Sequence, residues 1–256
     1  MLPSSPLSLW WRDLVLATTF LTRLPLGRGL AAEPGELARA ARVMPLVGAG
    51  VGLGGGLVYA IGDGLGLPSF LSALLALGAT ALVTGALHED GLADTADGFG
   101  GGTERARKLA IMRASDIGTY GVLAVVLSLG LRAGALSALA EPGTVALALI
   151  ATHGLARAAL PPIMAALPPA REDGLAVGVG RVAASHAWTA VVLGAAIAWL
   201  TLGLGSALIV VLLAAVAAAL VARLARAQIG GVTGDVLGAA EQAVECAVLI
   251  GLVALL

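Results

Sequence analysis

Charged side chains are scarce in this sequence. They make up 12% of its 256 residues, whereas 59% of the residues are hydrophobic, and the mean hydropathy is +0.97. A soluble domain usually has about twice that charged fraction and less apolar content. The shortage of charge therefore excludes an ordinary soluble domain and places the chain among proteins that cross a membrane several times.

Three further shortages narrow the class of protein. The net charge of −1 contains no basic excess, which excludes a general affinity for nucleic acid. Cys246 is the single cysteine and cannot form an internal disulfide, so nothing in the sequence points to an oxidising compartment. The start lacks the basic segment that opens a signal peptide, and Arg23 and Pro25 interrupt the apolar run at 14–21. We therefore expect no cleavable signal peptide.

Long apolar stretches are what the chain has in abundance. Stretches of roughly 17–25 mainly apolar residues predict membrane-spanning helices. Seven such stretches predict an all-α, polytopic membrane helical bundle that forms one domain over residues 1–256. A shorter amphipathic stretch at 9–25, headed by Trp10 and Trp11, is predicted to lie in the membrane interface. The predicted spans are 43–62, 68–87, 117–140, 144–166, 187–203, 205–222 and 243–256, the last short enough to begin a few residues earlier.

Basic residues lie on alternate connections between these spans. The connections near Asp63 and Glu141 and at 201–206 hold none. By the positive-inside rule the basic connections are cytoplasmic, which puts the N-terminus inside and the C-terminus outside. Most acidic residues share that side, so we expect an inner-membrane protein whose active site faces the cytoplasm. Thirteen of the 15 basic residues fall in the N-terminal segment and in 88–116, 167–186 and 223–242.

A group of acids follows the second apolar stretch, in the segment GALHEDGLADTADGFGGGTERARK (85–108). Asp90, Asp94 and Asp97 are spaced i, i+4 and i+7, so on a helix they share an arc of about 60°. Like charges on one stripe destabilise a helix unless a cation lies between them. Carboxylate oxygens favour Mg²⁺ or Mn²⁺, which also bridges substrate phosphates. A solvated loop with unrelated acids is the alternative.

A second polar segment near the C-terminus reads GGVTGDVLGAAEQAVE (230–245). Asp235 directly follows Gly234 and lies two residues after Thr233, with Glu241 and Glu245 further on. The pattern predicts a turn leading into a helix whose N-terminus helps to hold phosphate. A simple capped turn is the alternative.

An arginine lies within the predicted span 144–166. A buried Arg157 in lipid is costly and is expected to face a polar cavity or a carboxylate, whereas snorkelling from the end of the helix is the alternative. Carboxylates suited to a metal and arginines suited to phosphates together indicate phosphoryl-type transfer at a membrane face.

The segment HEDGLADTADG (88–98) resembles the His-x-Asp-Gly-Leu-Ala-Asp-Thr-x-Asp-Gly signature of the cobalamin synthase family, the adenosylcobinamide-GDP ribazoletransferases of vitamin B12 assembly. The resemblance covers nearly the whole chain. Further blocks match in the family's order: FLTRLP (20–25), IMRASDIGTYG (111–121), Arg157, REDGLA (171–176) and GGVTGDVLGA (230–239).

The resemblance implies a multi-span, Mg²⁺-dependent enzyme in the bilayer. It would transfer the activated phosphocobinamide of adenosylcobinamide-GDP to α-ribazole or its 5′-phosphate and release GMP. The implied catalytic acids are Asp90, Asp94, Asp97 and Asp235, of which the first three also bind the metal, and Asp97 or Asp235 accepts the proton. The implied substrate-binding residues are His88, Arg23, Arg113, Asp116, Arg157, Arg171, Thr233 and Glu245.

Some positions depart from the family pattern. Ala110, Ala114 and Gln242 differ from many relatives, so the roles of Asp116 and Glu241 stay open. The choice between α-ribazole and its phosphate, and whether the protein is a homo-oligomer, stay open too.

Two other classes of protein were weighed. CDP-alcohol phosphotransferases also place spaced aspartates at the inner end of a membrane helix, but their longer Asp-x-x-Asp-Gly-x-x-Ala-Arg pattern is absent from this sequence. A cation or metabolite transporter predicts acids deep within spans and an inverted repeat. The sequence shows no such repeat, and its acids gather at the ends of spans on one side of the membrane.

Overall fold

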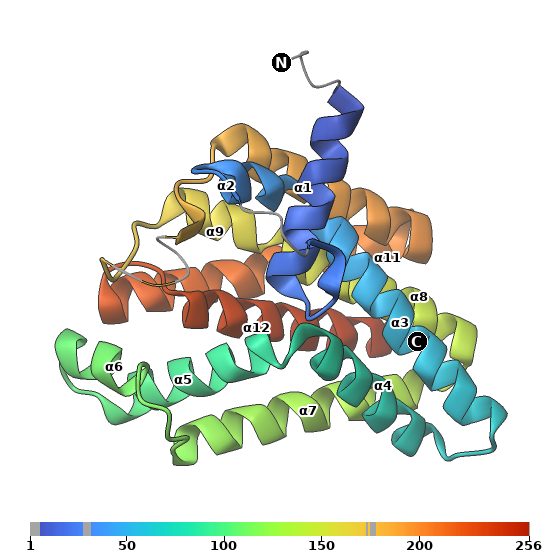
Figure 1. Ribbon diagram of the computed structural model, residues 1–256. Helices are drawn as coiled ribbons and strands as arrows, with labels where there is room; N and C mark the ends of the chain where they lie inside the picture. The colour runs from blue at the N-terminus through green and yellow to red at the C-terminus, as the bar shows by residue number, and fades with distance from the viewer. Residues whose placement is uncertain (1–5, 28–31, 173, 175–177, 256) are drawn as a thin grey trace.

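The computed structural model describes residues 6–27, 32–172, 174 and 178–255, and all the named elements of this part of the chain are helices (Figure 1). Short 3₁₀ turns at Pro25–Gly27 and Ala41–Val43 supplement the α-helices. The predicted all-α class is confirmed. The α-helices are α1 (Pro6–Leu21), α2 (Glu36–Ala40), α3 (Met44–Gly64), α4 (Ser69–Thr84), α5 (Leu87–Gly101), α6 (Arg105–Ile111), α7 (Thr119–Leu139), α8 (Pro142–Ala158), α9 (Leu160–Ala166), α11 (Ala184–Ile229) and α12 (Gly234–Val253).

The number of membrane crossings differs from the predicted seven. Among the described residues, five helical segments are long and apolar enough to cross a membrane, and the pair α4 and α5 makes a sixth if it is one broken span. The polytopic bundle is thus confirmed, and the count of seven is too high by this measure. The five segments are Glu36–Gly64, Thr119–Leu139, Pro142–Ala166, Ala184–Ile229 and Gly234–Val253.

The difference in count arises in α4, which meets this measure only together with α5, and in α11. This 46-residue helix takes up both predicted spans, 187–203 and 205–222. Its backbone is broken between them at Gly203, where φ is 76° and ψ is 165°. A straight helix of that length would measure about 69 Å, more than twice the hydrocarbon core. The break gives α11 two arms, each about as long as one crossing, which point in different directions (Figure 1).

Small residues allow an extensive close contact between α3 and α8. A Cβ atom at Gly52 would collide with the backbone of Leu149, and one at Gly56 would lie 2.8 Å from the Cα of Ala146. Gly52 and Gly56 of the run at 50–56 therefore serve close helix packing in an apolar surrounding. This contact is built along the face of α8 that also carries Arg157.

The opening helix α1 is not among the candidate spans. It is tied to α2 and the turn after it through Asp13, which is fully buried and accepts hydrogen bonds from Arg39 at 2.9 Å and Arg42 at 2.8 Å. Trp11 is 67% exposed on the other side. This division into a packed and an open face is what the amphipathic stretch predicts, and its place in the membrane interface stays a prediction.

The connections separate into two ends of the bundle. At one end Arg105 donates to the carbonyls of Ile229 at 2.8 Å and Ala170 at 2.7 Å, which joins three of the basic connections. At the other end the hydroxyl of Tyr59, near the end of α3, donates to the carbonyl of Ala140 at 2.9 Å, between α7 and α8. The predicted division of loops into two sets therefore matches the way the loops meet.

Candidate active site

A sharp turn before α5 directs the acidic segment. Gly85 and Ala86 have φ of 68° and 55°, and α5 departs from α4 at 91°. Glycine accepts the left-handed conformation without strain, and here a Cβ atom at Gly85 would also meet the side chain of Arg23. Arg23 is held against this turn by its backbone N–H, which donates to the carbonyl of Val83 at 2.7 Å. The predicted span 68–87 consequently ends at Thr84.

Helices α5 and α12 run antiparallel and lie side by side (Figure 1). Glycines make the contact close: a Cβ atom at Gly91 would lie 2.8 Å from the carbonyl oxygen of Asp235, and one at Gly238 would lie 3.1 Å from the Cα of Gly91. The first turn of α12 therefore packs directly on α5. Two segments more than 130 residues apart in sequence meet at this crossing.

The crossing gathers the four predicted catalytic acids. Asp94 is half-buried and interacts electrostatically with Asp90, Asp97 and Asp235, which repel its charge, and with Arg171, which attracts it. Asp90 is exposed. Several carboxylates facing a single guanidinium form a strongly negative patch, the setting that a divalent cation or a cationic group neutralises.

Asp97 has a structural partner of its own. Its carboxylate is buried and accepts hydrogen bonds from the backbone N–H groups of Gly118 at 2.6 Å and Gly121 at 2.9 Å. These groups open α7, so Asp97 acts as a cap for its N-terminus. A Cβ atom at Gly118 or Gly121 would overlap the carboxylate, which explains glycine at both positions.

Asp235 lies in the first turn of α12, as the sequence pattern predicts. Thr233 is the N-cap and accepts from the N–H of Val236 at 3.2 Å, and its hydroxyl lies 3.2 Å from Oδ2 of Asp235. A guanidinium nitrogen of Arg171 lies 3.5 Å from the same oxygen. Thr233, Asp235 and Arg171 thus form one small polar group at the helix N-terminus.

Three other predicted residues form a separate buried cluster. Arg157 of α8 pairs with Glu241 and, at 2.5 Å, with Glu245, both on α12. Its side chain is buried, so the carboxylate prediction is confirmed and the snorkelling alternative is wrong. Nδ1 of His88 lies 3.4 Å from Arg157 and 3.9 Å from Glu241. His88 and Glu245 therefore both contact Arg157, and all three side chains are buried.

Arg132 of α7 completes this cluster and was missed by the sequence analysis. It is buried, pairs with Glu245 at 2.6 Å and lies 3.5 Å from Glu89. Gln242 donates to Glu89 at 3.1 Å and accepts from Ser128 at 2.8 Å. A lone arginine in the middle of the predicted span 117–140 was the available signal, because such residues need a polar partner.

One group of described side chains brings its ligand atoms within 4.8 Å of one another as a metal site would: His153, Glu241 and Glu245. The predicted stripe of Asp90, Asp94 and Asp97 is not such a group in the described chain. The reason is that Asp97 turns to α7. In the buried group, Arg157 already contacts both glutamates, so a metal ion there would have to displace a guanidinium.

The remaining predicted residues lie on one connection. Arg113 and Asp116 are exposed between α6 and α7, on the segment whose end Asp97 caps. The predicted block 171–176 is described only in part, since 173 and 175–177 lie outside the described residues. Its Arg171 is described and contacts Asp235.

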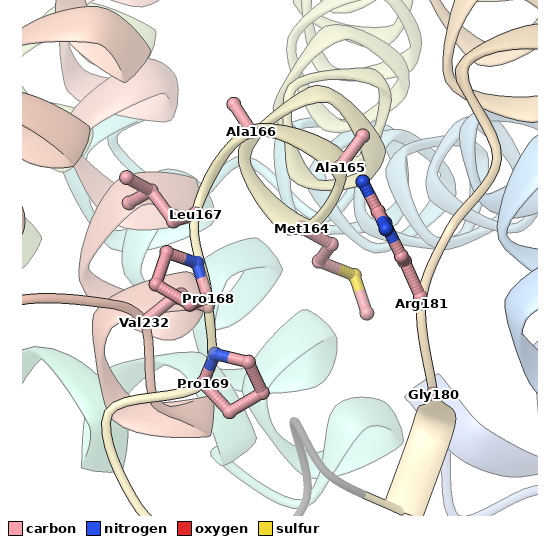
Figure 2. Close-up of a pocket in the computed structure, with 9 residues that line it drawn as sticks. All are labelled: Met164, Ala165, Ala166, Leu167, Pro168, Pro169, Gly180, Arg181 and Val232. Carbon is pink, nitrogen blue, oxygen red and sulfur yellow. The ribbon is translucent and has the colours of Figure 1, made fainter.

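A cavity of about 480 Å³ lies between the end of α9 and the segment that leads into α12. Its wall on one side is the pair of prolines Pro168 and Pro169 with Val232, and on the other side it is Arg181, whose side chain extends along α9 towards Ala165 (Figure 2). The N–H of Val232 donates to the carbonyl of Pro168 at 2.9 Å. This pairing fixes the residues that lead into Thr233 and Asp235 at the edge of the cavity.

Comparisons with known proteins identify the family. The chain matches the cobalamin-5-phosphate synthase family over residues 13–253. It is 52% identical over 238 residues to the adenosylcobinamide-GDP ribazoletransferase of Bradyrhizobium diazoefficiens, with 93% of this chain and 92% of the relative covered. It is 47% identical over 244 residues to the enzyme of the same name from Mesorhizobium japonicum, with 93% and 91% covered. No solved structure matches the chain. The chain belongs to the cobalamin-5-phosphate synthase family.

Proposed function

We propose that this protein is an adenosylcobinamide-GDP ribazoletransferase of cobalamin biosynthesis, the activity for which its relatives are named. One observation carries the proposal beyond the family match. Asp94 on α5 and Asp235 on α12 come from the two most specific sequence blocks and interact in one acidic group beside Arg171. Transfer of an activated phosphate needs such a concentration of metal ligands and cations more than it needs covalent chemistry.

The reaction joins a hydroxyl of α-ribazole, or of its 5′-phosphate, to the phosphorus that carries cobinamide. The bond from that phosphorus to the GMP oxygen breaks, and the hydroxyl proton passes to a base. Asp235 suits the role of base because its partners are a threonine hydroxyl and an arginine at 3.5 Å. Asp97 suits it less, since backbone N–H groups engage both of its oxygens.

Of the predicted stripe, Asp90 and Asp94 would hold Mg²⁺, whereas Asp97, whose two oxygens both accept hydrogen bonds from backbone N–H groups, suits this role less. The acids repel one another in the described chain, and hard oxygen ligands with room for water fit this ion. When bound, Mg²⁺ neutralises the charge of the diphosphate. Arg171 contacts Asp235 and would orient the guanylyl phosphate, and Arg23 and Arg113, whose side chains are exposed, are the other arginines proposed to bind phosphate oxygens outside the buried cluster.

An assay of GMP release tests whether the reaction requires both substrates. The purified protein in lipid vesicles with Mg²⁺ should release GMP from adenosylcobinamide-GDP only when α-ribazole is present. Asp94→Asn should reduce that release at least tenfold, whereas Asp63→Asn, at the opposite end of the bundle, should leave it unchanged. GMP release without α-ribazole would show a hydrolase and contradict the proposal.

A further inference from the structure

A long apolar groove runs along the outer side of the bundle. It encloses about 540 Å³ between α8 and α9 on one side and both arms of α11 on the other. The groove exists because its walls are mainly small: Ala215, Ala219 and Ala222 of α11 face Pro162 and Ala166 of α9. Ordinary Leu or Phe side chains at these positions would fill the space. It is separate from the acidic group of Asp90, Asp94 and Asp235.

The apolar part of the groove has the depth of one bilayer leaflet. It follows the second arm of α11 from Val211 to Ala222. At 1.5 Å per residue this stretch is about 17 Å long, and half of a hydrocarbon core is about 15 Å. The groove therefore suits an acyl chain that enters from one face of the membrane.

Two arginines lie at one end of the groove. Arg223 and Arg226 follow the apolar stretch, are exposed, and are the charged side chains among the described residues that line it. Their spacing of i and i+3 puts them on the same face of α11. They are near the end that carries Gly230, where the carbonyl of Ile229 engages Arg105. Both guanidiniums thus stand where the headgroups of that leaflet begin.

We propose that this groove is a binding site for an anionic phospholipid, with an acyl chain between α9 and α11 and the phosphate at Arg223 and Arg226. A soluble anion would not need the apolar walls, and a neutral lipid would not need two cations where no acid is among the described residues that line the groove. Arginine also recognises phosphate oxygens through paired N–H donors. The inference is independent of the proposed catalytic activity.

Native mass spectrometry of the protein released from vesicles of mixed phosphatidylglycerol and phosphatidylcholine tests the site. The wild type should retain phosphatidylglycerol preferentially. The double variant Arg223→Ala and Arg226→Ala should bind it about 30-fold more weakly, the effect of losing two surface cations. Arg107→Ala removes an exposed arginine of α6 outside the groove and should bind as the wild type does.

A second variant separates the groove from the charges. Ala219→Phe keeps both arginines and fills the apolar part, so it should also lose the retained lipid. A thermal unfolding transition in detergent like that of the wild type serves as the check that each variant is folded. Equal retention of the two lipids by the wild type, or retention of phosphatidylglycerol by either groove variant, would contradict the proposal. A mass spectrum that shows a dimer without retained lipid would also contradict the proposal, because a second copy of the chain would then cover the groove.

Discussion

Three aspartates of one helix have three different surroundings. Asp90 is exposed, Asp94 is half-buried among other acids, and Asp97 is buried against backbone N–H groups of α7. Their spacing correctly predicts a shared helix, but spacing alone cannot tell a metal ligand from a helix cap. The surroundings therefore assign different tasks to chemically identical residues.

Replacing Asp94 and Asp97 separately by asparagine should distinguish these tasks. Asp97→Asn replaces one of the two acceptor oxygens by an NH₂ group, which cannot accept from the backbone N–H it would face, and should lower the free energy of unfolding by about 1 kcal/mol, the net contribution of one hydrogen bond. Asp94→Asn removes a charge that its neighbours repel, so stability should be equal or higher while GMP release falls at least tenfold. Thermal unfolding in detergent and GMP release measure the two effects, and equal melting temperatures for both variants would contradict the assignment.

The buried cluster shows at the residue scale what a sequence cannot specify. The sequence predicts that Arg157 needs a carboxylate, because an uncompensated charge in lipid is costly. It does not say which carboxylate, since Glu241 and Glu245 lie more than 80 residues later. Arg132 and Glu89 join the same cluster through contacts between helices that no local pattern records. The sequence therefore predicts that a buried charge needs a partner, but it does not identify a partner that lies far away in the chain.

At the scale of helices, hydropathy predicted the spans and the break of α11 at Gly203, and it erred at the turn between α4 and α5. The apolar segments of α3, α7 and α8 were placed correctly because hydropathy is a local property. The turn at Gly85, which ends α4 and sets α5 at 91°, has no apolar signature. Predicting that turn requires the contact with α12, because that contact decides the direction of α5.

The crossing of α5 and α12 depends on Gly91. In Gly91→Ala the added Cβ atom would lie 2.8 Å from the carbonyl oxygen of Asp235, so the two helices must separate. Asp94 would then move away from Asp235, and we expect GMP release to fall at least tenfold, because small displacements of reacting groups are costly. The matched control is Gly54→Ala on α3, where a Cβ atom meets nothing within 4 Å. Similar activity of both variants would show that the close contact is not required.

At the scale of the whole molecule, one end of the helical bundle holds most of the charged residues and the other end holds few. The acidic group, Arg105 and the loop at 230–233 share the charged end, and the contact between Tyr59 and Ala140 marks the other. This division agrees with the sequence pattern, in which the basic residues lie on alternate connections and the connections between them have none. The helices place these loops together, and their position relative to the cytoplasm stays a prediction.

Labelling of cysteines in intact cells tests that position. In a Cys246→Ala background, Arg107→Cys on α6 should react with a membrane-impermeant thiol reagent only after the cells are permeabilised, because basic connections stay in the cytoplasm. Asp63→Cys, at the other end of the bundle, should react in intact cells. Both positions are exposed, so a difference in labelling reports sidedness and not burial. A highly charged nucleotide substrate does not cross the apolar core of a bilayer unaided. Labelling of Arg107→Cys in intact cells would therefore place the acidic group away from the cytoplasmic nucleotides and overturn the topology and the proposed access of the substrate together.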